Sequence, residues 1–300
     1  MASPQIELPV LGTELADTRV RRRNLIILLS VLAGAGLAAA WPTNVMDMSF
    51  PNRIGSEILG YNAGSVSIAG LLGGAAFAVV AGFANTLTAC NFAALGSVGA
   101  LSGSSRLSPG AKALRHLGWF SAGMIGVAGI YGAAAVALGS RLPQLAAAPM
   151  GDAVSPRIVQ AAVVYGLTGL AFIYLGLAEL GLAPSPFAAL SRRLRYAPLV
   201  VLGGLVGLES VGRPHPMPIK LLQFTASTHN PGYGALALIL QAVGGLAIIG
   251  LVSLGLSYGT RGRFERWMSA RPGRMAALTS AGFLVAGIFT VVFWDIRLGR

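Results

Sequence analysis

The residues best suited to chemistry lie in two polar interruptions of apolar stretches. The first interruption holds the single cysteine of the chain, in the order Phe83-Ala84-Asn85-Thr86-Leu87-Thr88-Ala89-Cys90-Asn91-Phe92. A thiol can ligate a soft metal ion or form a mixed disulfide, and a free cysteine can also serve as a small buried hydrophobic residue. We expect Cys90 to be the catalytic thiol, with Asn85, Thr88 and Asn91 lining the same site.

The second interruption reads Gly212-Arg213-Pro214-His215-Pro216-Met217-Pro218. Its three prolines lack backbone donors and cannot continue a helix. His215 could carry a proton or ligate a metal, because imidazole titrates near neutrality. It could equally cap a helix or satisfy backbone groups that the prolines leave open. Cys90 and His215 together give two metal ligands, which is fewer than the four of a structural zinc site but enough to pass a soft ion.

Two charged residues accompany the second interruption. Glu209 and Arg213 are four positions apart, so on a continuous helix they would share a face and pair. Charges at membrane depth are costly and therefore mark candidate functional sites, although such a pair can also simply neutralise itself. We expect Glu209, Arg213 and His215 to line a substrate or ion site. The positive charge of Arg213 and His215 would favour the thiolate form of Cys90 if the two interruptions meet.

The composition is that of a membrane protein. Of 300 residues, 54% are hydrophobic and only 11% are charged, against about 25% charged residues in soluble domains. The net charge of +12 lies between apolar runs, which indicates orientation in a membrane rather than nucleic-acid binding. One cysteine excludes an intrachain disulfide and a cysteine-rich metal cluster. No motif identifies a cofactor or a soluble-enzyme activity.

The apolar runs predict an all-α integral membrane protein with about seven transmembrane helices. Residues 1–23 form a polar tail, and residues 24–62 form an N-terminal anchor followed by an external loop. The anchor also resembles a secretory signal, with small residues at 38–40 as a cleavage site. We expect it to be retained, because further spans follow it.

Six more apolar segments follow: 63–103, 117–138, 158–182, 197–228, 232–258 and 275–294. The first and fourth exceed the roughly 20 residues of a simple span, and each contains one of the two interruptions. Basic residues alternate between the two sides, with fifteen in the segments of one side against five in those of the other. By the positive-inside rule the N-terminus is cytoplasmic and the C-terminus external.

After the anchor, the crossings divide into a first repeat, 63–183, and a second repeat, 184–300. Because each holds three crossings, the second enters from the opposite face, giving 3+3 inverted repeats with broken first helices. The spacing of residues supports an alignment of the two repeats. Gly82 precedes Cys90 by eight residues, and Gly207 precedes His215 by eight residues. In this alignment Cys90 and His215 occupy equivalent positions.

The stretch Leu87-Thr88-Ala89-Cys90-Asn91-Phe92-Ala93 resembles the first Leu-Ser-Pro-Cys-x-x-Pro motif of the DsbD/CcdA-type membrane proteins, without its prolines. The stretch 224–236 is similar to the segment that follows the second cysteine of that family. The resemblance implies a thiol-redox or maturation role that serves an exported protein such as a c-type cytochrome, and the methylamine-utilisation membrane proteins look like a related branch. The family shuttles a disulfide between two intramembrane cysteines, and here Pro214-His215-Pro216 stands at the second position.

A single thiol cannot exchange one intramolecular disulfide for another. We therefore expect a bacterial inner-membrane protein that acts through the thiol of a periplasmic or membrane protein partner, with no nucleic acid involved. Two alternatives stay open: a transporter of a small solute or soft metal ion, and a non-catalytic subunit of a larger membrane complex.

Overall fold

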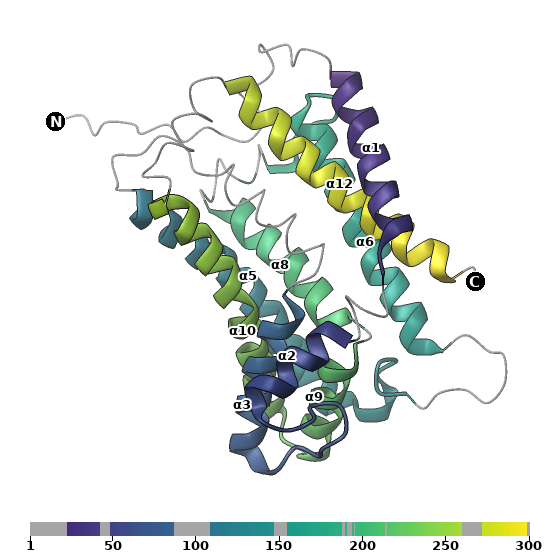
Figure 1. The fold of residues 1–300 in the computed structure, drawn as a ribbon, viewed down its shortest axis with the longest axis vertical. Helices are drawn as coiled ribbons and strands as arrows, with labels where there is room; N and C mark the ends of the chain where they lie inside the picture. Colours follow the sequence, from purple (N-terminus) through teal and green to yellow (C-terminus); the bar gives the residue numbers. More distant parts are fainter. Residues whose placement is uncertain are drawn as a thin grey trace.

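The computed structural model describes residues 23–42, 49–86, 109–146, 155–187, 190, 194, 196–213, 215–259 and 272–298. Every regular element in these ranges is helical (Figure 1). The helices are α1 (Arg23–Ala40), α2 (Phe50–Leu59), α3 (Gly70–Asn85), α5 (Pro109–Leu138), α6 (Pro156–Glu179), α8 (Ala197–Gly212), α9 (Pro216–Ser227), α10 (Pro231–Gly259) and α12 (Pro272–Leu298), with the short 3-10 helix η2 (Gly139–Arg141) after α5.

Prolines set where many of these helices begin. Helices α5, α6, α9, α10 and α12 all begin at a proline. A first-turn proline fixes φ near the helical value and removes a backbone N–H that has no partner inside the helix. The sequence thus marks the boundaries of the long elements locally, before any packing is considered.

Five of the described helices are long and apolar enough to cross a membrane, which makes this a multi-pass membrane protein. They comprise α1, most of α5, all of α6, and the apolar parts of α10 and α12. Helices α3 and α8 are apolar but have only 16 residues each, which is about 24 Å against a hydrocarbon core of about 30 Å. These two are the helices whose continuations carry the polar interruptions.

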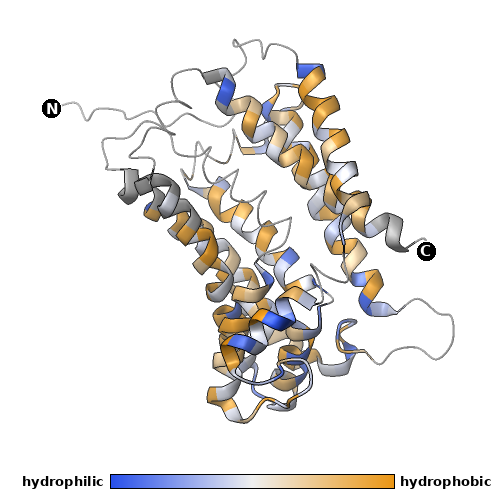
Figure 2. Ribbon diagram, viewed as in Figure 1, coloured by the Kyte–Doolittle hydropathy of each residue, from blue (hydrophilic) through white to orange (hydrophobic). Residues whose placement is uncertain are grey.

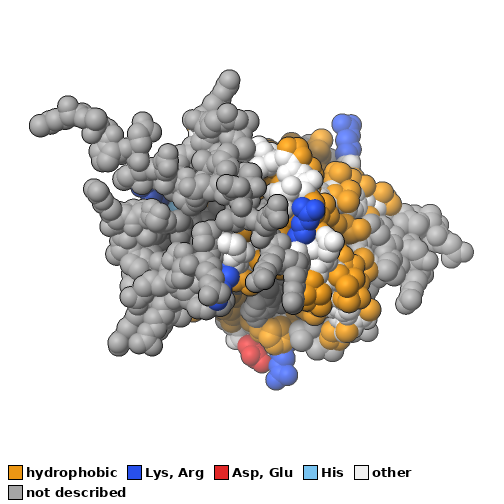
Figure 3. Space-filling view, turned by 90° about the horizontal axis from the view of Figure 1, so that it is seen from above, with side chains coloured by type: hydrophobic (Ala, Val, Ile, Leu, Met, Phe, Trp, Pro, Cys, Tyr) orange, Lys and Arg blue, Asp and Glu red, His pale blue; other side chains and the backbone are white. Residues whose placement is uncertain are grey.

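The outer surface is apolar along the helices, as lipid contact requires. Leu72 is 88% exposed, Leu251 is 76% exposed and Ile130 is 75% exposed. Figure 2 shows hydrophobic residues running along α1, α5, α6 and α12. The end-on view in Figure 3 shows a described surface that is mostly hydrophobic, with isolated basic side chains. Such extensive apolar surface is uncommon on soluble monomers.

The helices pack in two groups with α8 between them (Figure 1). One group contains α1, α12 and α6, and the other contains α3, α5 and α10. Helix α8 packs along α5 in the second group and also contacts α6 in the first. The end of α8 therefore lies where the two groups meet.

Glycines at the crossings bring the backbones close together. A Cβ added at Gly82 of α3 would overlap the carbonyl of Gln241 in α10, and a Cβ at Gly203 of α8 would overlap the carbonyl of Phe120 in α5. Gly207 likewise faces the backbone of Met124. Small residues allow helices in lipid to approach and gain van der Waals contact.

The contacts also give the relative directions of the helices. Gly74 faces Tyr233 and Gly82 faces Gln241, so α3 and α10 run parallel. The contacts of Phe120 with Gly203 and of Met124 with Gly207 make α5 and α8 parallel as well. Helices α5 and α10 are antiparallel, because residue 132 faces 234 whereas residue 117 faces 250. Helices α6 and α12 are antiparallel as well, because residue 169 faces 287 whereas residue 176 faces 280.

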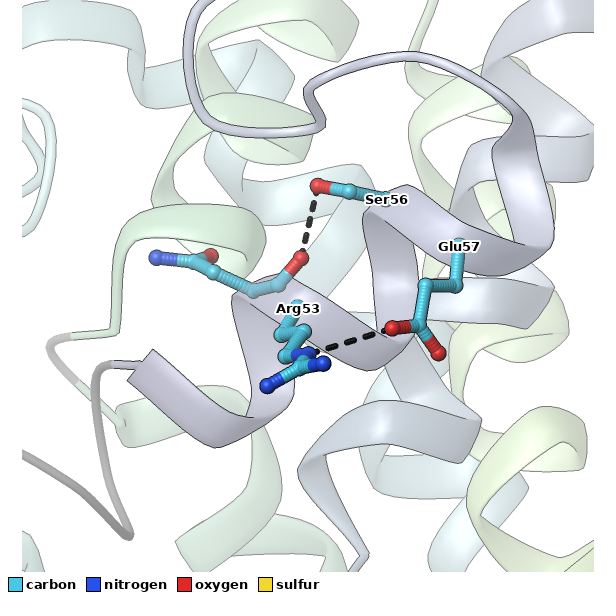
Figure 4. A network of polar contacts seen from close by, with 4 residues as sticks. Arg53, Ser56 and Glu57 are labelled. Carbon is cyan, nitrogen blue, oxygen red and sulfur yellow. Dashed lines mark hydrogen bonds and ion pairs between the residues drawn. The ribbon is translucent and has the colours of Figure 1, made fainter.

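The segment 42–62, expected to be an external loop, contains helix α2. This helix begins at Phe50, next to Pro51, and ends at Leu59. Gly60, with φ 72°, caps it through its N–H on the Ser56 carbonyl. Arg53 and Glu57 form an ion pair at 3.1 Å on its exposed face (Figure 4). Proline near the start and a left-handed glycine at the end are ordinary helix boundaries, so the signal was present.

The second interruption breaks the helix as the prolines predict. Helix α8 ends at Gly212, Arg213 is extended with ψ 125°, and α9 begins at Pro216. Lys220 of α9 donates to the carbonyls of Ala63 and Val66, which ties α9 to the turn before α3. In the first interruption α3 ends at Asn85, and residues 87–108 lie outside the described residues.

Candidate functional site

Arg213 connects three separate parts of the chain at the break between α8 and α9. Its Nε donates to the hydroxyl of Tyr165 on α6 at 3.2 Å. Its Nη1 donates to the backbone carbonyl of Asn85 at the end of α3, at 3.3 Å. The Arg213 carbonyl accepts from Nε2 of Gln144, at 3.1 Å, in the segment after η2. The second interruption therefore contacts the beginning of the first, as the sequence analysis required for a joint site.

Asn85 contributes its backbone carbonyl to the contact with Arg213. Its Nδ2 donates to the Ala81 carbonyl at 2.8 Å, and the next residue, Thr86, donates its hydroxyl to the Gly82 carbonyl at 2.7 Å. Both side-chain donors are thus directed back onto α3. The carbonyl of Asn85 then accepts from the Arg213 guanidinium, because a helix leaves its last carbonyls without intrahelical partners.

Glu209 lies in the interior at the contact between α8 and α6. Its side chain is 2% exposed, and its backbone carbonyl accepts from the Tyr165 hydroxyl at 2.8 Å. The expected pairing of Glu209 with Arg213 is wrong as a close ion pair. Among the described residues the ion pair within 4.0 Å is Arg53 with Glu57. Helix α8 stops at Gly212, so Arg213 leaves the helical face on which an i, i+4 pair forms.

His215 caps α9, the role that the sequence analysis set beside metal binding and proton transfer. It is 2% exposed, and its Nδ1 accepts from the Met217 N–H at 3.4 Å. This hydrogen bond satisfies one of the N–H groups that the first turn of a helix leaves open. In the described part of the chain, no three His, Cys, Asp or Glu residues are grouped to hold a metal ion.

Three predicted site residues, Thr88, Cys90 and Asn91, lie outside the described residues. Cys90 follows Thr86 by four residues. The expected Cys90–His215 metal site therefore stays a prediction, as does the catalytic role of Cys90.

The structure adds site residues that sequence reasoning missed. Tyr165 receives a hydrogen bond from Arg213 and donates one to Glu209, and its ring stacks on Trp294 of α12 with centroids 4.5 Å apart and an interplanar angle of 11°. Stacking of the ring together with hydrogen bonds at its hydroxyl fixes the position of the phenol. Because tyrosine is common in apolar segments, the sequence does not single out Tyr165. Only its partners from distant segments identify it as a site residue.

A second group of polar side chains adjoins Arg213. Gln144 is 1% exposed and accepts through Oε1 from the Tyr131 hydroxyl, which in turn accepts from Nε2 of Gln160 at 2.8 Å. These residues come from α5, α6 and the segment after η2. Polar residues at membrane depth require such partners.

We call Asn85, Tyr165, Glu209, Arg213 and His215 the break cluster. It joins a guanidinium, a buried carboxyl group, an imidazole and a phenol in the interior of the protein. Such a set can stabilise an anion such as a thiolate through the guanidinium, and it can hold a proton or cation through the carboxyl group. All its members come from helix ends or from the α6–α8 contact.

Comparisons of this chain with protein-family models, with curated proteins and with solved structures find no match.

Proposed function

We propose that the protein is a bacterial inner-membrane protein of seven crossings, with a cytoplasmic N-terminus and an external C-terminus, whose last six crossings form two inverted repeats. The packing supports this arrangement. A pseudo-two-fold axis would superpose α3 on α8, α5 on α10 and α6 on α12. It would then carry the parallel pair α3–α10 onto the pair α8–α5, which is also parallel. It would carry the antiparallel pairs α5–α10 and α6–α12 each onto itself.

The glycine register supports the same exchange. Gly82 and Gly207 occupy equivalent positions, eight residues before Cys90 and His215. Gly82 lies against the backbone of α10, and Gly207 lies against the backbone of α5. Each glycine thus faces the second helix of the opposite repeat, which is the relation that a pseudo-two-fold axis requires.

We infer that this arrangement serves thiol chemistry on an exported redox protein, as in the DsbD/CcdA-type proteins that the sequence resembles. The observation that carries the proposal is the hydrogen bond from Arg213 to the Asn85 carbonyl. It places a guanidinium at the end of α3, five residues before Cys90. A cation beside a cysteine favours the thiolate, which is the form that attacks a disulfide.

With one thiol, the reaction is a mixed disulfide with a partner protein. The Cys90 thiolate attacks one sulfur of the partner's disulfide, an S–S bond forms between the two proteins, and the other partner sulfur leaves as thiolate. A different thiol of the partner then attacks the partner sulfur of the mixed disulfide, and Cys90 leaves as the thiolate. The partner keeps one disulfide in a new pairing, so the exchange is an isomerisation with no net oxidation or reduction.

Mixed-disulfide trapping tests this function. Membranes quenched with acid and alkylated should yield a Cys90-linked adduct that reduction removes and that Cys90→Ser lacks. Arg213→Gln should slow the alkylation of Cys90 at neutral pH about tenfold. The control Arg53→Gln, on the exposed face of α2, should leave the alkylation rate unchanged.

Two outcomes would count against thiol chemistry. One is a Cys90→Ser strain that matures its exported redox proteins normally. The other is an alkylation rate of Cys90 that does not respond to Arg213→Gln. Together they would favour the non-catalytic subunit.

A transporter of a small solute or soft metal ion is the second candidate. It is favoured by the convergence of polar groups from α3, α6 and the α8–α9 break in the membrane interior, since transporter sites lie at the interface of repeats formed by broken helices. Uptake into proteoliposomes, lost in Arg213→Gln and retained in Arg53→Gln, would support this function over the first.

A further inference from the structure

The carboxyl group of Glu209 has an environment that does not match a negative charge. Among the described residues neither of its oxygens makes a hydrogen bond of ordinary geometry, although the side chain is 2% exposed; the Thr168 hydroxyl is the polar group that acts on it. Arg213 interacts with it only at longer range, because the guanidinium donates to Tyr165 and to Asn85. A buried carboxylate without hydrogen bonds or an adjacent cation is strongly disfavoured relative to the neutral acid.

The adjacent hydroxyl group fits the neutral acid. The Thr168 side chain on α6 interacts with the Glu209 carboxyl group, but its hydroxyl donates its hydrogen to the Val164 carbonyl at 2.8 Å. With that hydrogen committed, the Thr168 oxygen can accept a hydrogen bond but has none to donate. A protonated carboxyl group supplies the missing donor, and a carboxylate does not.

Few other ionisable groups come from the helices around Glu209. Helix α6 contributes Tyr165 beside Glu209, with Arg157 near its beginning and the buried Glu179 at its end. Helix α5 contributes Tyr131, whose hydroxyl is held by Gln144 and Gln160. Its basic residues, Lys112, Arg115 and His116, lie near its beginning, with Arg115 over the Tyr196 ring at 4.9 Å. Helix α10 contains no acidic or basic residue. On α12, Asp295 and Arg297 follow Trp294, the residue that stacks on Tyr165.

We propose that Glu209 is a proton-binding site in the membrane interior, occupied by one proton in the structure described above. The proton is released when the Arg213 guanidinium turns from the Asn85 carbonyl to pair with the carboxylate. The balance is simple: the carboxyl O–H bond breaks, the proton leaves to water, and an ion pair forms. This proposal rests on the part of the proposed function that places the protein in a membrane. It does not require Cys90 or a transported solute.

Infrared difference spectroscopy of the full chain in proteoliposomes tests the proposal. Between about pH 5 and pH 9 the wild type should show the C=O band of a protonated carboxylic acid, shifted in D₂O. Because Glu179 of α6 is a second buried carboxyl group, the comparison is made in a Glu179→Gln background. There Glu209→Gln should remove the band, and Glu57→Gln, a matched change on exposed α2, should leave it. Cys90→Ser should also leave the band intact, so this site and the thiol function can fail separately.

Three results would overturn the proton site. The first is a wild type without the band, and the second is a band that Glu209→Gln does not alter. The third is a band that Na⁺ removes at constant pH, which would assign the site to a metal cation. If the Gln variant does not fold, Glu209→Asp retains the acid and should shift the band. A band that stays unshifted in Glu209→Asp would contradict the proposal.

Discussion

Helices α3 and α8 have the same length and a similar place in the packing, but their carboxyl ends differ in chemistry. Each has 16 residues and lies parallel to a long helix, α10 for α3 and α5 for α8. At the end of α3, Asn85 and Thr86 direct their side chains back to the carbonyls of the same helix. At the end of α8, Arg213 reaches out to both α3 and α6.

The comparison shows that helix packing and site chemistry depend on different residues. Small residues on the helix faces set how closely the backbones approach, and they do so alike in α3 and α8. The residues at the two helix ends differ: the Thr86 hydroxyl donates back to α3, whereas Arg213 donates to α3 and α6. Two helices that pack alike can thus end in different chemistry.

The largest effect is expected where the two helices are alike. Gly82→Ala and Gly203→Ala each place a Cβ on a backbone carbonyl of the facing helix, that of Gln241 or Phe120. Neither carbonyl can move without shifting a helix, so each variant should lose about 3 kcal/mol of stability. Thermal unfolding in detergent, followed by the loss of monodisperse protein, measures it.

The matched controls are glycines on the same two helices that have room. Gly73 has nothing within 4 Å of an added Cβ, and Gly204 meets only a Val127 methyl at 3.7 Å. Gly73→Ala and Gly204→Ala should leave the unfolding temperature unchanged or raise it, because alanine has the higher helix propensity. A loss at only one of Gly82 and Gly203 would break the likeness of the two helices.

The next effect should appear only at the end of α8. Arg213→Ala removes two hydrogen bonds donated by a charged group and leaves the Asn85 carbonyl without this donor. Hydrogen bonds to charged groups contribute about 1.5–3 kcal/mol each, so we expect a loss of about 2–3 kcal/mol after partial rearrangement. Denaturant unfolding of the purified protein gives the value. Equal losses for Arg213→Ala and Asn85→Ala would contradict the difference between the two ends.

A smaller loss is expected at the start of α9. His215→Ala removes the side-chain cap on the Met217 N–H, which should cost about 1 kcal/mol. His215→Asn supplies another capping acceptor and should restore most of that stability. If Asn does not restore it, the imidazole has a role beyond capping.

The smallest effect should come from the end of α3. Thr86→Val removes a hydrogen bond to the Gly82 carbonyl of the same helix. Side-chain hydrogen bonds in membrane proteins average about 0.6 kcal/mol, so the unfolding temperature should barely change. A loss as large as that of Arg213→Ala would show that the end of α3 carries more of the site than its hydrogen bonds indicate.

Features that depend on local sequence could be predicted, and those that depend on tertiary contacts could not. The prolines at 214, 216 and 218 predict the break between α8 and α9 because they act on the backbone of their own segment. The membrane class follows from the long apolar runs in the same way. Helix α2 could have been found from Pro51 and Gly60, but its few apolar residues made a loop the simpler interpretation.

The partners of Arg213 could not be read from the chain. Tyr165 and Gln144 are 48 and 69 residues away from it, and nothing in their neighbourhoods distinguishes them from ordinary polar residues. The expected pairing of Glu209 with Arg213 failed because i, i+4 spacing predicts contact only while the helix continues, and α8 stops one residue before Arg213.

The central claim is that the two interruptions meet as equivalent parts of two repeats, with Cys90 and His215 at matching positions. Oxidation of the His215→Cys variant tests it most directly, because a disulfide requires Cα atoms within about 7 Å. We expect the introduced cysteine to form a rapid intramolecular disulfide with Cys90. Loss of alkylation at both thiols and mass spectrometry of the linked peptides would detect it. The control Ser227→Cys, at the far end of α9, should form none. The oxidant must be strong enough to link thiols of other membrane proteins in the same sample. If both thiols of the His215→Cys variant stay free under those conditions, the claim is contradicted.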